Sequence, residues 1–214
     1  MQVTLKKFFP KIAAIREAQP FILISLLFSL GYGLATTILG GIGLSLYTGM
    51  IGIYSLFLGL LKYSALKKYV DISLLSDGTE IQKAEKNCTK NIAIYATLMS
   101  FWLLSFFIVS TFFYVEIPNH LYGLWFVLFV SGLAFVKLIL ATINSIQTRK
   151  NHNKIIHQLK LTDNANALIA IGLTLRTILY FTNFEYARLI SGISGIFFGS
   201  TALIVCLIMF IKIK

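Results

Sequence analysis

The chain has 214 residues, of which 57% are hydrophobic and 13% charged, and its net charge is +11. Soluble domains carry about 25% charged residues, so this composition excludes an ordinary soluble protein and favours one that lies within a membrane. The positive charge is scattered over several short segments without interleaved aromatic residues. That pattern argues against a nucleic-acid partner and is explained by attraction to anionic membrane lipid.

Six apolar stretches set the predicted architecture, because a helix needs about 20 apolar residues to cross a bilayer. The stretches lie near residues 21–45, 47–62, 92–114, 121–145, 166–182 and 187–211. Together they use most of the chain and leave only short connections. The sequence therefore predicts an all-α polytopic membrane helix bundle, with residues 21–214 forming a single six-span domain.

The basic residues fall in alternate connections. Most of the 19 lysine and arginine residues lie before the first span, between the second and third, between the fourth and fifth, or after the last. By this division Lys160 belongs to a connection, and Lys62, the last residue of the second span, is grouped with the connection that follows it. Because basic residues gather on the cytoplasmic side, both termini are predicted to be cytoplasmic, with three hairpins pointing outward.

Residues 1–20 precede the first span and combine apolar residues such as Phe8 and Ile12 with four basic residues. Such a segment suits the headgroup layer, with its apolar side toward the lipid tails. We therefore expect an interfacial N-terminal segment that ends at Pro20, since proline is well tolerated in a first helical turn.

Small residues in the two terminal spans are predicted to pack against other helices. They are Gly31, Gly40 and Gly41 in the first span and Ser191, Gly195 and Gly199 in the last. Small side chains let helices approach closely in lipid, where packing drives association. The sequence leaves open whether these contacts lie within one chain, in a homo-oligomer or against a partner membrane protein.

The longest polar stretch, residues 63–91, contains the turn signal Asp77-Gly78 and a match to the capping box in Thr79 and Gln82. It predicts a helix that begins near Thr79 and continues into the third span. With the second span extended to about Val70, the two helices form a hairpin that stands off the membrane on the cytoplasmic side.

Lys137 and Arg176 lie well inside predicted spans. A charge near the bilayer centre costs about 3 kcal/mol and marks a functional site by default. Two structural explanations compete with that one: Lys137 could reach the inner headgroups with its long side chain, and Arg176 could anchor the outer end of its span. No acidic residue lies deep inside a predicted span to pair with either, which argues against a proton relay built on carboxylates.

A numerical regularity links Lys62, Lys137 and Lys212, which are spaced by 75 residues and each lie toward the cytoplasmic end of an even-numbered span. A threefold repeat of helical hairpins would produce it, since internal repeats are common in transport folds. The rest of each unit shows little identity, so chance is the favoured explanation.

Catalytic signatures are missing from the chain. It contains no HExxH, GxSxG or Walker motif, and the three histidines fall in connections. The sequence thus predicts a protein that is not an enzyme, with no catalytic residue, metal site or cofactor.

The C-terminal third carries a resemblance to a known family. Its residues are Phe135-Val136-Lys137-Leu138, Ala141, Ile143-Asn144, Arg149-Lys150, Asn151, Leu173-Thr174-Leu175 and Thr177. This pattern resembles a family of small six-span integral membrane proteins of Gram-positive bacteria that has no assigned activity. The resemblance implies a multi-pass protein of a bacterial plasma membrane and directs attention to Asn144 beside Lys137 and Arg176.

Two functions are favoured over a third, an enzyme that acts on a lipid substrate. The first is a non-enzymatic membrane protein that binds or transports a small or amphiphilic solute, possibly anionic, through Lys137, Arg176 and Asn144. The alternative is an accessory, assembly or protective subunit that acts through helix–helix contacts with a partner protein. A polar cavity that reaches the buried charges would favour the first, and an exposed groove of small residues would favour the second.

Overall fold

The computed structural model describes residues 20–42, 45–75, 77–112, 123–147, 153–182 and 184–211. Six helices account for nearly all of them: α3 (Pro20–Ile42), α4 (Leu46–Ile72), α5 (Gly78–Phe112), α6 (Leu124–Gln147), α7 (Lys154–Phe181) and α8 (Ala187–Ile211). All six are long and apolar enough to cross a membrane. The predicted all-helical architecture with six helices long and apolar enough to cross a membrane is confirmed, while the interfacial segment predicted before Pro20 lies outside the described residues.

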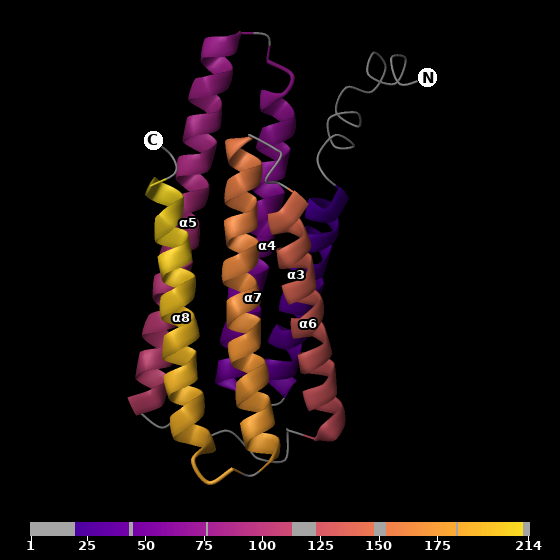
Figure 1. Cartoon of the computed structure of the whole chain (residues 1–214), viewed down its shortest axis with the longest axis vertical. Coiled ribbons are helices and arrows are strands. Elements are labelled where there is room, and N and C mark those ends of the chain that lie inside the picture. Colours follow the sequence, from indigo (N-terminus) through magenta and orange to yellow (C-terminus); the bar gives the residue numbers. More distant parts are fainter. Residues whose placement is uncertain are drawn as a thin grey trace.

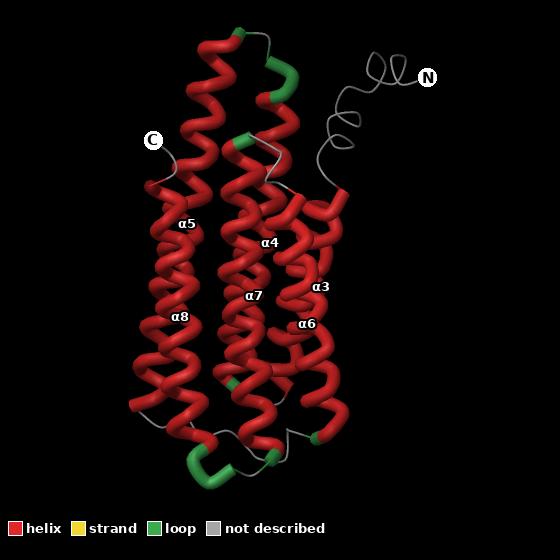
Figure 2. Tube along the Cα trace, viewed as in Figure 1, coloured by secondary structure: helices red, strands yellow, loops and turns green. Residues whose placement is uncertain are grey.

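The helices form a bundle and alternate in direction along the chain (Figure 1). The start of α3, the turn between α4 and α5, and the end of α8 therefore lie at one end, and the described turns are short compared with the helices (Figure 2). Helix α3 packs against α4 and α6, and α8 packs against α5 and α7. Helices α5 and α6 are not neighbours, so the predicted middle hairpin does not form as a packed pair. This arrangement also does not fit the threefold repeat of helical hairpins that the spacing of Lys62, Lys137 and Lys212 suggested.

The hairpin of α4 and α5 extends beyond the other helices at this end of the bundle (Figure 1). Helix α5 begins two residues earlier than a cap at Thr79 would allow. Asp77 is the actual cap: its side chain accepts hydrogen bonds from the Thr79 backbone N–H at 2.9 Å and from the Thr79 hydroxyl at 2.8 Å. Those bonds lower the pKa of Asp77, because they favour its charged form. The capping box predicted from Thr79 is therefore wrong, although the hairpin is present.

The largest boundary error concerns α7, which begins at Lys154 and not near residue 166. Asn153 caps the helix by accepting hydrogen bonds from two backbone N–H groups in the first turn. Lys160 and Asp163 lower the hydropathy of its first half, which is why the sequence placed that half in a connection. Both residues are nevertheless buried in the bundle.

Glycines bring α3 and α4 together. A Cβ on Gly40 would lie 2.3 Å from the backbone nitrogen of Gly49, so the two helix backbones approach as closely as sterics allow. Gly31 and Gly41 were predicted to serve the same purpose but lie off this face. A Cβ on either would meet no atom within 4 Å, because both residues point away from α4.

The small face of α8 receives aromatic rings from inside the same chain. A Cβ on Gly195 would lie 2.8 Å from the hydroxyl of Tyr47, and one on Gly199 would lie 2.9 Å from the ring of Phe107. Tyr47 and Phe107 stack on each other at 5.0 Å. Ser191, the third member of the predicted face, is fully buried. This face is therefore used within the bundle and is not left open for a partner.

Candidate functional site: a buried polar layer

Polar side chains form a layer inside the bundle, whose buried apolar residues belong to two cores. One core lies toward the α4–α5 turn and includes Ile22, Leu66 and Ile155, and the other occupies the remainder of the bundle. Serines of α3 and α4, lysines of α4 and α6, and polar residues of α7 meet in the layer. The members of this polar layer are Ser25, Ser29, Ser55, Lys62, Lys137, Asn144, Asp163 and Asn166.

Lys62 of α4 and Asp163 of α7 form an ion pair in this layer, with exposed fractions of 0% and 6%. The ammonium group also donates to the hydroxyl oxygens of Ser25 at 3.3 Å and Ser29 at 3.0 Å. A lysine has three N–H donors, so all those of Lys62 have acceptors. Such complete hydrogen bonding is what allows a charged pair to remain buried.

Lys137 of α6 lies in the same layer but makes a different set of contacts. Its ammonium group donates to Ser55 Oγ and to Asn166 Oδ1, both at 2.9 Å, and stands 3.4 Å from the centroid of the Tyr32 ring. The exposed fraction of Lys137 is 5%. A buried ammonium group is thus held by neutral oxygens and an aromatic face, with no carboxylate among its hydrogen-bond partners in the described part of the chain.

Asn144, the second predicted ligand-binding residue, joins the layer two helical turns beyond Lys137 on α6. Its side-chain amide donates to Asp163 Oδ2 at 3.1 Å, and its backbone carbonyl accepts from Lys160. The Lys160 ammonium group stands at the last turn of α6, where carbonyl groups favour a positive charge. The structure therefore places Lys137 and Asn144 in one layer, where Asp163 accepts from Asn144 and borders the same small cavity as Lys137.

Hydrogen bonds connect the two lysines of the layer. Asn166 donates to Ser29 Oγ at 3.3 Å, and the Ser55 hydroxyl donates to the backbone carbonyl of Ser29 at 3.2 Å. Lys62 donates to that same Ser29 hydroxyl, and Lys137 to both Asn166 and Ser55. A change in the charge or position of one lysine therefore affects the other through Ser29, which accepts from Lys62 and from both partners of Lys137.

A cavity of about 10 Å³ lies inside the layer, bordered by Ser25, Phe28, Ser29, Lys137, Asp163 and their neighbours. A volume of about 10–15 Å³ is the least that holds a water molecule, and the polar lining supplies the partners such a water needs. Anything larger requires the surrounding side chains to move.

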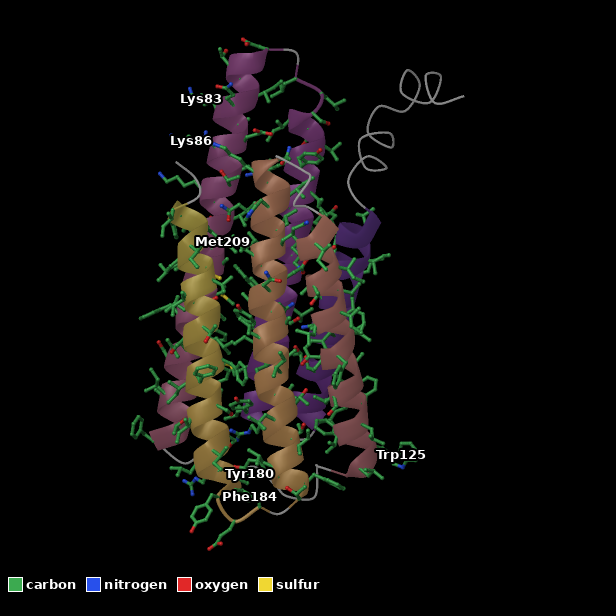
Figure 3. The ribbon with its side chains drawn as sticks, in the orientation of Figure 1. Lys83, Lys86, Trp125, Tyr180, Phe184 and Met209 are labelled. Atoms are coloured by element: carbon green, nitrogen blue, oxygen red, sulfur yellow. The ribbon has the colours of Figure 1, made fainter. Side chains whose placement is uncertain are left out.

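Arg176, the third predicted ligand-binding residue, lies elsewhere. It is ten residues beyond Asn166 on α7, about 15 Å along the helix, and near the end of the bundle that holds Tyr180 (Figure 3). Its guanidinium carbon lies 3.8 Å from the centroid of the Tyr47 ring and 5.2 Å from that of Tyr180. One N–H donates weakly to Ser191 Oγ at 3.5 Å, and Nε has no hydrogen-bond partner among the described residues.

Asp163, Lys62 and Asn166 were missed by sequence reasoning. The statement that no acidic residue lies deep in a span is wrong, because Asp163 falls three residues before the predicted fifth span and α7 begins much earlier. Placing Lys160 in a connection is wrong for the same reason, and placing Lys62 in one is wrong because α4 continues to Ile72; both lysines are buried within helices. The available signal was the spacing of polar residues at 158, 162, 163 and 166, which follows one helical face.

Among the described residues, no group of three or more histidine, cysteine or acidic side chains converges as a metal site would require. Comparisons with protein-family models, with curated proteins and with solved structures found no match to this chain. The resemblance in the C-terminal third stays a prediction. Inference about function therefore starts from the polar layer.

Proposed function

We propose that this chain is a non-enzymatic, multi-pass membrane protein that binds and moves a small or amphiphilic anionic solute, with Lys137 as the anion-facing group. The main observation in support is that the ammonium group of Lys137 is buried and donates its hydrogen bonds to neutral oxygens. Asn144 orients the neighbouring carboxylate of Asp163 and completes the site.

The charge balance of the polar layer supports an anionic ligand. Lys62 and Asp163 compensate each other, which leaves the positive charge of Lys137 uncompensated. A charged side chain near the middle of a membrane costs about 3 kcal/mol on insertion scales. A bound anion would offset that cost, because opposite charges attract strongly where water is scarce.

The depth of the layer supports movement of the solute. Lys137 and Asn166 lie near the midpoints of α6 and α7. Solute sites of secondary transporters lie near the bilayer midplane, between helix groups that rock to open each side in turn. The water-sized cavity means that binding requires such separation of helices.

We also propose that the end with the α4–α5 hairpin is cytoplasmic and that the protein resides in a bacterial plasma membrane. Lys83 and Lys86 lie at that end, whereas Trp125, Tyr180 and Phe184 lie at the opposite end (Figure 3). Basic residues favour the cytoplasmic side. With Cys88 and Cys206 replaced, an impermeant thiol reagent should label cysteine at position 120 in intact cells and spare position 78. The reverse labelling would overturn this orientation.

Thermal unfolding of the purified protein in detergent tests the binding function. The probes are sodium phosphate and carboxylates of increasing chain length from acetate to palmitate. A ligand present at 100 times its Kd stabilises a protein by about 2.7 kcal/mol, so at least one probe should raise the Tm of the wild type. Lys137→Gln should abolish the shift, because an amide can still donate hydrogen bonds but carries no charge.

Lys83→Gln is the matched control, since Lys83 is exposed on α5 and far from the layer. It should respond to the probes as the wild type does. If no probe shifts the wild type, or if both lysine variants respond equally, the proposed function is wrong.

One observation favours the alternative of an accessory or assembly subunit: the protruding α4–α5 hairpin presents exposed lysines to the surroundings. Gly40, Gly195 and Gly199 do not support it, because they pack inside the chain, and only Gly31 and Gly41 of the predicted set meet no atom of the described part of the chain. If the hairpin binds an acidic partner protein, Lys83→Glu with Lys86→Glu should release that partner on purification in mild detergent. Loss of the partner without any anion response in the wild type would place this alternative first.

A further inference from the structure

An open apolar groove of about 420 Å³ lies between α3 and α6. Leu27, Phe28, Gly31 and Tyr32 line it from α3, and Phe129 and Leu133 line it from α6. Its volume falls within the range of about 300–1,000 Å³ that is typical of ligand sites. In a protein that spans a membrane, this groove opens toward the lipid chains.

Two of its residues connect the groove to the polar layer. Phe28 lines the groove and also the water-sized cavity that contains Lys137 and Asp163, so its ring separates the two spaces. Tyr32 lines the groove while the face of its ring lies 3.4 Å from the Lys137 ammonium group. The Tyr32 hydroxyl is buried and has no hydrogen-bond partner among the described residues.

We propose that the solute is an anionic amphiphile with a single hydrocarbon chain, and that it enters sideways from the lipid between α3 and α6. This inference rests on the proposed function and adds the class of ligand and its route. The chain lies in the groove. The anionic headgroup passes Phe28 and meets the ammonium group of Lys137 and the hydroxyl of Tyr32.

The charge of Lys137 and the polar hydroxyl of Tyr32, next to an apolar groove, favour an anionic amphiphile over other ligands. A neutral hydrocarbon would fill the groove but leave the Lys137 charge uncompensated and the Tyr32 hydroxyl without a partner. A small inorganic anion would satisfy both groups but has no use for an apolar groove of this size. An anionic headgroup on one chain satisfies the cation, the hydroxyl and the groove together, and buried polar groups strongly favour the ligand that pairs them.

Two glycines of α3 allow a matched test. Gly31 lines the groove and Gly41 does not, yet a Cβ on either meets no atom within 4 Å. Gly31→Leu therefore places a side chain in the groove with no clash at its Cβ, and Gly41→Leu makes the same change on the same helix away from the groove. Both substitutions raise helix propensity alike, so neither should impair folding.

The probe is palmitic acid with a diazirine at mid-chain, photolysed with the protein in phosphatidylcholine nanodiscs, and labelled peptides are identified by mass spectrometry. We expect labels on α3 and α6 in the wild type and in Gly41→Leu. Their yield should fall at least fivefold in Gly31→Leu and in Lys137→Gln. The hexadecanol analogue, which has no charge, should label the wild type at least fivefold less.

The outcomes separate this inference from the proposed function. Loss of labelling in Lys137→Gln with full labelling in Gly31→Leu would keep Lys137 as an anion site and overturn the lateral route. Equal labelling by the acid and the alcohol, or in all variants, would overturn the amphiphile site, because neither the headgroup charge nor the groove would then matter. A short anion that stabilises the wild type through Lys137, while palmitate does not, would leave the proposed function standing without this ligand.

Discussion

Lys62 and Arg176 are both cations buried in the bundle, but the protein holds them in different ways. Lys62 faces a carboxylate and two hydroxyl groups that together accept all three of its N–H donors. Arg176 lies between the rings of Tyr47 and Tyr180, with one long hydrogen bond to Ser191. The first is a compensated charge and the second is a charge supported by aromatic faces.

This difference separates two explanations of a charged residue in a membrane helix. A compensated pair is costly to break, because removing one partner leaves the other buried and uncompensated. A cation on aromatic faces can be removed and leave only neutral groups behind. Lys137 lies between these cases, because it donates to a hydroxyl group and a side-chain amide oxygen but has an aromatic ring where Lys62 has a carboxylate.

The largest expected effect follows from breaking the pair. Asp163→Leu should lower the free energy of unfolding by about 3–5 kcal/mol, because it leaves the Lys62 ammonium group buried without its counter-charge. Lys62→Leu should cost a similar amount by exposing the carboxylate of Asp163 to the same apolar surroundings. Both are measured by thermal or denaturant unfolding of purified protein in one detergent.

The double variant Lys62→Leu with Asp163→Leu serves as the control for that comparison. It removes both charges and should recover most of the lost stability, since apolar replacements of a buried ion pair are often neutral or stabilising. Additive losses in the double variant would show that the two residues do not act as a pair.

A smaller effect is expected on the packing around Tyr47. Gly195→Leu should destabilise by about 1–3 kcal/mol through overpacking, because a Cβ at this position would already lie 2.8 Å from the Tyr47 hydroxyl. Gly41→Leu is the matched control and should retain wild-type stability. Unfolding midpoints of the two variants decide the matter, and equal midpoints would mean that α8 does not pack on Tyr47 in this way.

The sequence was sufficient to predict the six helices because each carries a long apolar window. It also identified Arg176, since an isolated charge among leucines is conspicuous in any hydropathy pattern. Asp163 escaped because hydropathy is averaged along the chain, whereas burial depends on what surrounds a side chain in space. The carboxylate is buried by partners more than 100 residues away, Lys62 and Ser25, and no local average contains them.

The same limit applies to the glycines. Their number predicted close helix packing, but only the helix rotation shows which of them face a neighbour. Gly40 lies against Gly49 on α4, whereas Gly31 faces the α3–α6 groove. Rotation is set by the polar layer, because Ser25 and Ser29 must face Lys62.

The smallest effect is expected at Arg176, where the comparison with Lys62 is sharpest. Arg176→Leu removes a cation–π contribution of about 0.5–2 kcal/mol. It also removes the cost of a buried charge, about 3 kcal/mol on insertion scales. These terms oppose each other, so the free energy of unfolding should change little or rise slightly. Arg176→Lys should be the less stable of the two variants, because it keeps the charge and loses the planar group that stacks on the rings.

Anion binding provides the second measurement on these variants. Because Arg176 lies about 15 Å along α7 from Asn166, palmitate should stabilise Arg176→Leu as much as the wild type. A stability loss in Arg176→Leu as large as that of Lys62→Leu would mean that Arg176 has a buried counter-charge of its own. Loss of the palmitate response in Arg176→Leu would instead extend the anion site from Lys137 to the far end of the bundle. If Arg176→Leu retains both its stability and its palmitate response, Lys137 is the cation that binds the solute. Arg176 then only anchors α7 through its contacts with the rings of Tyr47 and Tyr180.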